Sequence, residues 1–342
     1  GPQAGATATH SYTAAGRWLA SVTVTDSLGA TGTASAPDTV TAGAAASLAF
    51  EQQPTATVAG VVIAPAVTVR VRDAFGNPVA GTPVALAMAD GGALNGGGAA
   101  TSDSSGRVTF AALIVNQAGS RQLKASSGAL APATSGTFVV SAAAASALSF
   151  ATQPSNVAAG AIMSPAPRVK VADAFGNGIA GAPVALTMLG TGSLTGGNAA
   201  ETDSTGTATF AGLSLDLVGG KLMSASSGAL APVTSNAFIV SAAAPATLTF
   251  STQPSNVVAG ETISPAPQLQ LTDAFGNAVP GAPVALTLVG AGTLAGGAAV
   301  STDSAGTVSF PGLSVNLAGG KRLSASSGAL APVASDPFDV SA

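Results

Sequence analysis

The sequence predicts an all-β protein, a tandem array of antiparallel β-sandwiches, and three observations support this prediction. From Phe50 onward the chain repeats with a period of one hundred residues, so that Asp-Ala-Phe-Gly-Asn stands at residues 73–77, 173–177 and 273–277. Apolar residues within each repeat alternate with polar ones, as in half-buried strands. Glycine, asparagine and proline separate these short runs, and no long pattern with a helical period occurs.

The repeat divides the 342 residues into three similar domains and a shorter N-terminal segment. A unit of this size is near the commonest domain size and can bury its own core. The joints between repeats, residues 141–145 and 241–245, are alanine-rich and contain no glycine, so we expect limited bending there. The expected domains are residues 1–45 for the N-terminal segment, then 46–144, 145–244 and 245–342.

About seven short strands are expected in each repeat. In the first, Val67, Val69 and Val71 alternate with polar residues, a pattern that buries one face of a strand. The second and third repeats keep aliphatic residues at these positions. Further strands are expected at residues 48–50, 84–88, 107–113, 122–126 and 137–140. The predicted core comprises Phe50, Phe110 and Phe138, surrounded by Val84, Leu86, Leu113 and Leu123.

Composition excludes several classes of function. The chain has no cysteine, hence neither disulfides nor thiolate metal sites, and its one histidine, His10, lies outside the repeats. Charged residues make up 8% of the chain, the net charge is -4, and no basic stretch is available to grip nucleic-acid phosphates. No run of apolar residues is long enough for a membrane-spanning helix. We therefore expect an extracellular protein with a neutral surface rich in hydroxyl groups.

Several ordered motifs carry a resemblance to a known family. They are Val-x-Asp-Ala-Phe-Gly-Asn-x-Val-x-Gly-x-Pro-Val, then Thr/Ser-Asp-Ser-x-Gly-x-x-x-Phe, then Ala-Gly-x-x-x-Leu-x-Ala-Ser. From about residue 46 onward the chain resembles bacterial immunoglobulin-like repeats of the invasin/intimin type. The resemblance implies immunoglobulin-like sandwiches in the stalk of a large surface adhesin, with binding assigned to domains at the tip and no catalysis. The matching positions are Asp73, Gly76, Asn77, Val79, Gly81, Val84, Asp103, Gly106, Phe110, Gly119 and Ala125.

The N-terminal segment has a different pattern. The run from His10 through Trp18 to Gly29, with Val22 and Val24 alternating with threonines, resembles the second half of a PKD-type domain, another extracellular β-sandwich. Two or three strands cannot close a core alone. The segment packs on the first repeat, pairs with another chain, or reflects an arbitrary boundary, and the sequence favours the last. Trp18 is expected to fill a core position.

Two aspartates in each repeat are candidate ligands for calcium, which needs six to eight oxygen ligands. No Asp-x-Asp-x-Asp run lies nearby, and an Asp side chain in a turn accepts backbone N–H bonds while Gly and Asn tolerate positive φ. We therefore expect structural turns and no metal or other cofactor, and keep calcium as the alternative. The residues concerned are Asp73, Asp103, Asp173, Asp203, Asp273 and Asp303.

No constellation of residues predicts an enzyme. The repeats lack the histidine of a Ser/His/Asp arrangement, and their few acids fall in turns instead of forming a carboxylate pair. The glycine-rich stretches are not followed by Gly-Lys-Ser/Thr, so they do not predict a phosphate site. Trp18 and Tyr12 are the only Trp and Tyr of the chain, so the repeats have no such ring on which a sugar could stack.

We expect a structural function: a stalk or spacer of a bacterial cell-surface or secreted adhesin, projecting a distal binding domain. Its partners would be neighbouring domains of the same protein, and nucleic acid would not be among them. One alternative is direct binding of a host protein or glycan through the loops at residues 89–100, 189–200 and 289–300. Another is a homopolymeric extracellular filament, in which strands of a neighbouring chain complete the N-terminal half-domain.

Overall fold

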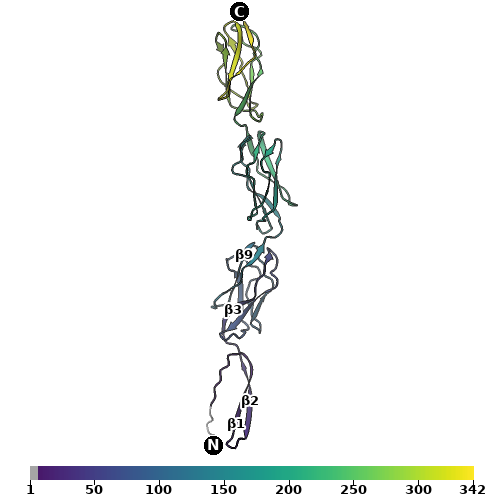
Figure 1. Cartoon of the computed structure of the whole chain (residues 1–342), viewed down its shortest axis with the longest axis vertical. Helices are drawn as coiled ribbons and strands as arrows, with labels where there is room; N and C mark the ends of the chain where they lie inside the picture. Colours follow the sequence, from purple (N-terminus) through teal and green to yellow (C-terminus); the bar gives the residue numbers. More distant parts are fainter. Residues whose placement is uncertain (1–6) are drawn as a thin grey trace. The chain divides into compact units, whose positions relative to one another are not determined.

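The computed structural model describes residues 7–342 and divides them into two compact units (Figure 1). The first unit extends to Ala145 and also includes Ala172–Asn177; the second comprises Ser146–Val171 and Gly178–Ala342. The segment Ala172–Asn177 therefore packs with the first unit although its sequence belongs to the second repeat. Every regular element in the described part of the chain is a strand, and none of it is a helix that could cross a membrane.

The first repeat consists of short strands arranged in two layers. A three-stranded sheet has the order β3-β5-β8, and the opposite layer contains the sheets β11-β10-β6-β7 and β4-β12-β9. The strands are β3 (Ala45–Gln52), β4 (Thr57–Val58), β5 (Val67–Asp73), β6 (Pro83–Met88), β7 (Ala100–Thr101), β8 (Arg107–Phe110), β9 (Gly119–Arg121), β10 (Leu123–Ser126), β11 (Ala133–Thr134) and β12 (Phe138–Ser141).

The second repeat has the same arrangement, with the orders β13-β15-β19 and β14-β23-β21-β16-β18. Its second layer is one continuous sheet because β21 is unbroken, whereas Gln122 separates β9 from β10 in the first repeat. The strands are β13 (Ala147–Thr152), β14 (Val157–Ala158), β15 (Arg168–Ala172), β16 (Pro183–Leu189), β17 (Leu194–Thr195), β18 (Ala199–Glu201), β19 (Thr207–Thr209), β20 (Ser214–Leu215), β21 (Gly219–Ser226), β22 (Val233–Thr234) and β23 (Phe238–Ser241).

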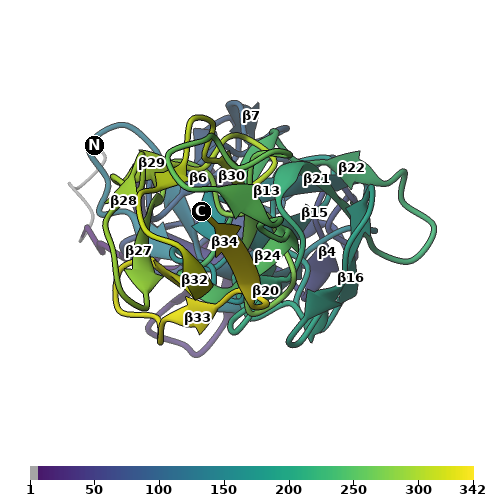
Figure 2. The ribbon, with the colours of Figure 1, turned by 90° about the horizontal axis from the view of Figure 1, so that it is seen from above.

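The third repeat has the orders β24-β26-β30 and β25-β34-β32-β27-β29. Figure 2 shows β27, β32 and β33 side by side, in agreement with their pairing. The strands are β24 (Pro245–Thr252), β25 (Val257–Val258), β26 (Gln268–Asp273), β27 (Pro283–Val289), β28 (Leu294–Ala295), β29 (Val300–Ser301), β30 (Thr307–Ser309), β31 (Ser314–Val315), β32 (Gly319–Ser326), β33 (Val333–Ala334) and β34 (Phe338–Ser341).

Each repeat is an immunoglobulin-like β-sandwich, and one of its strand pairs is parallel. At the start of the first repeat, β3 pairs with β5 in one layer, and then β4 pairs in parallel with β12 in the other. The buried Pro54 lies between β3 and β4, where the chain leaves the first sheet. Proline cannot donate to a strand ladder, so it suits this crossover. The predicted antiparallel sandwich is confirmed, with this one parallel pair in each repeat as an addition.

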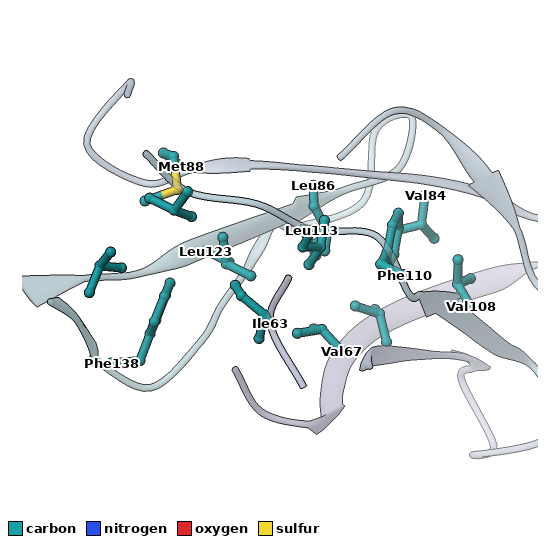
Figure 3. Close-up of a cluster of buried hydrophobic side chains, with 14 of the residues drawn as sticks. Ile63, Val67, Val84, Leu86, Met88, Val108, Phe110, Leu113, Leu123 and Phe138 are labelled. Atoms are coloured by element: carbon teal, nitrogen blue, oxygen red, sulfur yellow. The ribbon is translucent and has the colours of Figure 1, made fainter. Parts of the chain in front are cut away.

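Side chains from both layers meet in the core of each repeat, as Figure 3 shows for the first. Val67, Val69 and Val71 are fully buried on one face of β5. The predicted core positions Val84, Leu86, Leu113, Leu123, Phe110 and Phe138 are buried as well. Phe50 is only half-buried and packs against the edge of this cluster. The second and third repeats have separate clusters built from the corresponding residues.

The N-terminal segment forms a hairpin of β1 (Gly16–Thr25) and β2 (Thr31–Val40), paired along their whole length. The expected core position of Trp18 is wrong, because its side chain is 40% exposed. Val22 and Val24 alternate with threonines as predicted, yet both are exposed. The physical reason is that no second sheet faces this hairpin within the described residues. Trp18 instead stacks on Tyr12, with 5.6 Å between ring centroids.

The separate cores predict that a core defect stays local. Replacing the fully buried Leu123 with alanine should destabilise the first repeat by about 2–5 kcal/mol. Hydrogen exchange followed by mass spectrometry should then accelerate in peptides from residues 46–144 and remain unchanged in those from the third repeat. The matched control is Lys124→Ala, at the exposed neighbouring position of β10. Equal acceleration in all three repeats would contradict separate cores.

Candidate functional site: the Asp-Phe-Asn turns

The most regular feature outside the cores is the turn at residues 73–77, 173–177 and 273–277, called here the Asp-Phe-Asn turn. In the first repeat it begins at Asp73, the last residue of β5. The Asp73 N–H donates to the Asn77 carbonyl, and the Gly76 N–H donates to the Asp73 carbonyl. Gly76 has a φ of 86°, a conformation that glycine adopts without steric cost. The motif therefore closes a tight loop at the end of a core strand.

The carboxylate of Asp73 is the centre of this turn. Oδ1 accepts the backbone N–H groups of Phe75 (2.9 Å) and Asn77 (2.8 Å). Oδ2 accepts the side-chain amide of Asn77 (2.9 Å) and the backbone N–H of Gly43 (2.9 Å), which lies on the segment entering the repeat. The Asp73 side chain therefore accepts hydrogen bonds from its own turn and from the segment that precedes the repeat.

The other two copies repeat this arrangement. In the first unit, Oδ2 of Asp173 accepts the N–H of Ala143 at 2.8 Å. In the second unit, Oδ2 of Asp273 accepts the N–H of Ala243 at 3.0 Å. Both donors lie in the alanine-rich joints that the sequence singled out. The joints are therefore restrained by hydrogen bonds to a buried carboxylate, in addition to being short.

The asparagine of each turn binds the backbone of a preceding segment. Oδ1 of Asn177 accepts the Ala118 N–H (2.9 Å), and its Nδ2 donates to the Asn116 carbonyl (2.8 Å). Asn277 makes the same pair of bonds with Val218 (3.2 Å) and Asp216 (2.7 Å). We call residues 13–15, 116–118 and 216–218 the docking segments.

Asn77 binds the first docking segment, with the Ala15 N–H donating to Oδ1 and Nδ2 donating to the Thr13 carbonyl, both at 2.9 Å. This segment precedes a two-stranded hairpin, whereas the other two lie within sandwiches. The bonded groups are in each case a carbonyl at one residue and an N–H two residues later. Because only the backbone is bonded, side chains as different as those of Thr13, Asn116 and Asp216 serve equally well.

The phenylalanine of the turn lies against a glycine of the preceding repeat. A Cβ built on Gly60 would lie 2.5 Å from Cζ of Phe175, and one built on Gly160 would lie 2.2 Å from Cζ of Phe275. Both distances are too short for any side chain, so glycine admits the ring here. Phe75 has no such glycine in the hairpin and is 68% exposed, against 45% and 50% for Phe175 and Phe275.

A basic side chain lies at the same position in each repeat, and in the first and third repeats it donates to the segment at residues 116–118 or 316–318. Arg121 donates to the carbonyls of Ala118 (2.7 Å) and Gln117 (3.2 Å) and also pairs with Asp90. Lys221 and Lys321 occupy the same position and are buried. Lys221 donates to the Thr191 carbonyl, and Lys321 donates to the Ala318 carbonyl at 3.3 Å.

The hydrogen bonds of the turn also lower the pKa of its aspartate. The Asn77 side-chain amide is the main cause for Asp73; burial opposes it, the N–H groups add to it, and the pKa falls to about 2. For Asp173 and Asp273 burial is the largest influence and raises the pKa. The bonds from Asn177 and Asn277 and from the joint N–H groups outweigh it, so the net shift is downward. All three carboxylates are ionised at neutral pH.

The second set of candidate calcium ligands lies in a separate hairpin turn of each repeat. Oδ1 of Asp103 accepts the backbone N–H and hydroxyl of Ser105 and the N–H of Arg107. Asp203 and Asp303 accept corresponding bonds from residues two and four positions later. Within residues 7–342, no three acidic or histidine side chains are grouped so as to hold a metal ion. The six aspartates are thus placed in turns, with donors directed at their oxygens.

Sequence reasoning found the turn but not its contacts with preceding segments. Asn77 and Phe75 were recognised as parts of a turn motif, but their contacts were missed, and the docking segments were missed altogether. One signal was present: a phenylalanine stands in the same polar turn three times, although Asp, Gly and Asn suffice to form it. The docking segments left no signal because they take part through their backbone.

No family model and no curated protein matches the chain. Among solved structures, the Escherichia coli adhesin FdeC matches with 21% identity and a TM-score of 0.44, covering 88% of this chain and all of that one. Yersinia pseudotuberculosis InvD matches with 18% identity and a TM-score of 0.41, covering 84% and 96%. A tetra-tandem repeat from the extending region of a large adhesion protein covers 96% and 81%, with 14% identity and a TM-score of 0.34.

FdeC is an adhesin, and the tetra-tandem repeat belongs to a large adhesion protein. The identities of all three lie below 25% and their TM-scores below 0.5.

Acid should open the Asp-Phe-Asn turns before it unfolds the cores. The pKa of Asp73 is about 2 in the folded chain, against about 4 for a free Asp. A lowered pKa stabilises the fold above pH 4, and this contribution is lost as the pH falls from about 4 to about 2. The NMR signal of the Gly43 amide, which donates to Asp73, should shift over this window. The Gly81 amide donates to a carbonyl instead and should stay constant until global unfolding.

Alanine substitutions can distinguish the steric effect of the contact between Phe275 and Gly160 from the cost of positive φ at a non-glycine residue. Gly160 and Gly260 both have positive φ, 74° and 86°, so an alanine at either should cost about 1–2 kcal/mol. A Cβ at Gly160 would also strike Phe275, whereas one at Gly260 meets no atom within 4 Å. Gly160→Ala should therefore accelerate exchange of the Val218 amide, and Gly260→Ala should not. Adding Phe275→Ala should remove the clash; equal effects of both glycine variants would disprove the contact.

Proposed function

We propose that the chain is a structural spacer of a bacterial cell-surface or secreted adhesin, which holds a distal binding domain away from the envelope. In this proposal residues 46–144, 145–244 and 245–342 are three separately packed domains. The observation that carries it is the set of paired hydrogen bonds from Asn77, Asn177 and Asn277 to the docking segments. A protein that acts through spacing needs such a repeated joint, whereas an enzyme does not.

Linked hydrogen bonds at the joint would resist a pulling force. The carboxylate of Asp173 accepts a hydrogen bond from the joint residue Ala143, and Asn177 accepts one from Ala118 of the docking segment, 59 positions earlier in the sequence. Asp173 and Asn177 are themselves linked at 2.8 Å. Movement at the joint would therefore break several coupled, partly buried hydrogen bonds together, including charge-assisted ones.

The surface supports an extracellular setting. Charged residues make up 8% of the chain, and the exposed strand positions are largely Ser, Thr and Ala. A surface with so few charges limits nonspecific electrostatic attraction to other molecules. In this proposal the partners are neighbouring domains of the same protein. Calcium is not required, because the oxygens of Asp73, Asp173 and Asp273 already accept donors from the chain.

Deleting one repeat in register tests the spacer function. Removal of residues 146–245 joins Ala145 to Ala246 and brings the turn of Asn277 to the sequence position of Asn177, so the joint to Asn116 and Ala118 should reform. The chain is displayed on cells with a fluorescent tag at its distal end, and the height of the tag above the membrane is measured. The deletion should lower the tag by about 30–40 Å, the length of one sandwich, and EDTA should leave both heights unchanged.

The control is the full chain with Lys124→Ala, an exposed substitution that should leave the height unchanged. An unchanged height after the deletion would contradict the spacer function. Saturable binding of the untagged full chain to host cells or glycans would contradict it as well, and would assign the repeats a direct adhesive role.

A further inference from the structure

We propose that residues 316–318 of the third repeat bind the Asp-Phe-Asn turn of a further repeat. The proposal goes beyond the spacer function, because it identifies a binding surface and the motif that the surface recognises. It concerns a part of the chain that none of the three turns described above contacts.

The third repeat has a backbone carbonyl and a backbone N–H two residues later at the positions that bind a turn in the first and second repeats. Asn116 and Asp216 offer their carbonyls to an asparagine amide, and Ala118 and Val218 offer their N–H groups to its oxygen. Asn316 and Ala318 are the corresponding residues one period later. Because recognition uses the backbone alone, no particular side chain is required at residues 316–318.

Residues 316–318 are also fixed by hydrogen bonds from their own repeat, as residues 216–218 are in the second repeat. The Thr293 N–H donates to Oδ1 of Asn316 (2.7 Å), as the Ser193 N–H does to Oδ1 of Asp216 (2.6 Å). The Gly260 N–H donates to the Val315 carbonyl (2.9 Å), as the Gly160 N–H does to that of Leu215 (2.7 Å). The segment is therefore preorganised, which lowers the entropic cost of binding a turn.

Exposure distinguishes residues 316–318 from the bound segments of the first and second repeats. Asn116, Ala118, Asp216 and Val218 are half-buried, whereas Asn316 and Ala318 are exposed. Ala59 and Ala159, next to the glycines that admit a phenylalanine ring, are buried, and Ala259 is only half-buried. At Gly260 no atom lies within 4 Å of the Cβ position, so a ring can approach as Phe275 approaches Gly160.

The occupant is identified by the two bound examples. It must present a side-chain amide that donates to one carbonyl and accepts one N–H, with an aromatic ring directed at Gly260. Asn177 with Phe175 and Asn277 with Phe275 do this in the chain itself. A repeat that carries Asp-x-Phe-Gly-Asn therefore fits this surface.

The test extends the full chain with a second copy of residues 243–342, which places a new Asp-Phe-Asn turn one period after the third. Exchange of the Ala318 amide with solvent is measured by NMR in the original and extended chains. The extension should slow this exchange by about tenfold or more, because the amide becomes bonded. The Val218 amide is the internal reference and should not change.

Two variants of the appended copy make the test specific. Asn277→Ala in that copy should restore the exchange rate of Ala318 seen in the original chain. Gln268→Ala in the same copy removes an exposed side-chain amide on β26 and should leave the slowing intact. Circular dichroism of each extended chain confirms that the appended copy is folded.

Equal Ala318 exchange in the original and extended chains would overturn the proposal, as would slowing that survives Asn277→Ala in the appended copy. Slowing in the original chain that increases with protein concentration would assign the segment to a second copy and also overturn it. The display experiment uses only the joints already present, so its result is independent of this one.

Discussion

The buried carboxylate of the Asp-Phe-Asn turn is the interaction on which the arrangement of the chain depends. An ionised group with 2–4% exposure is tolerated only when its oxygens accept enough hydrogen bonds, and Asp73, Asp173 and Asp273 each accept four. The donors come from the turn itself and from the segment entering the repeat. Because one carboxylate satisfies both, the end of a core strand, the turn and the joint form a single structural unit.

Backbone recognition explains how one joint serves different neighbours. Asn77 bonds a segment ahead of an open hairpin, whereas Asn177 and Asn277 bond segments within sandwiches. A side-chain interface would require complementary substitutions whenever the preceding domain changes. A carbonyl and an N–H two residues apart occur in any extended segment, so a single asparagine suffices. The phenylalanine adds a steric requirement between repeats, because the rings of Phe175 and Phe275 occupy the space that a Cβ at Gly60 or Gly160 would take.

The repeats bury a core and the N-terminal hairpin does not, because only the repeats have two layers of strands. Each repeat closes two layers over aliphatic side chains and two buried phenylalanines, which are Phe110 and Phe138 in the first repeat. The hairpin has the right alternation and a tryptophan but only one layer, so Trp18 and Val22 remain exposed. Alternation of residue types defines a strand and its two faces, but burial requires a second sheet.

The all-β class, the period of the repeats and the buried faces of the repeat strands follow from the amino-acid pattern alone, because alternation and turn residues act over short distances. It correctly placed Val67, Val69, Val71, Phe110 and Phe138 in a core. It identified Asp73 as a turn residue, yet the bond to Gly43 depends on residues thirty positions apart. The pairing of Asn177 with Asn116 and Ala118, and the exposure of Trp18, depend on long-range packing. Both depend on which distant segment lies opposite, and backbone groups leave no trace in a sequence.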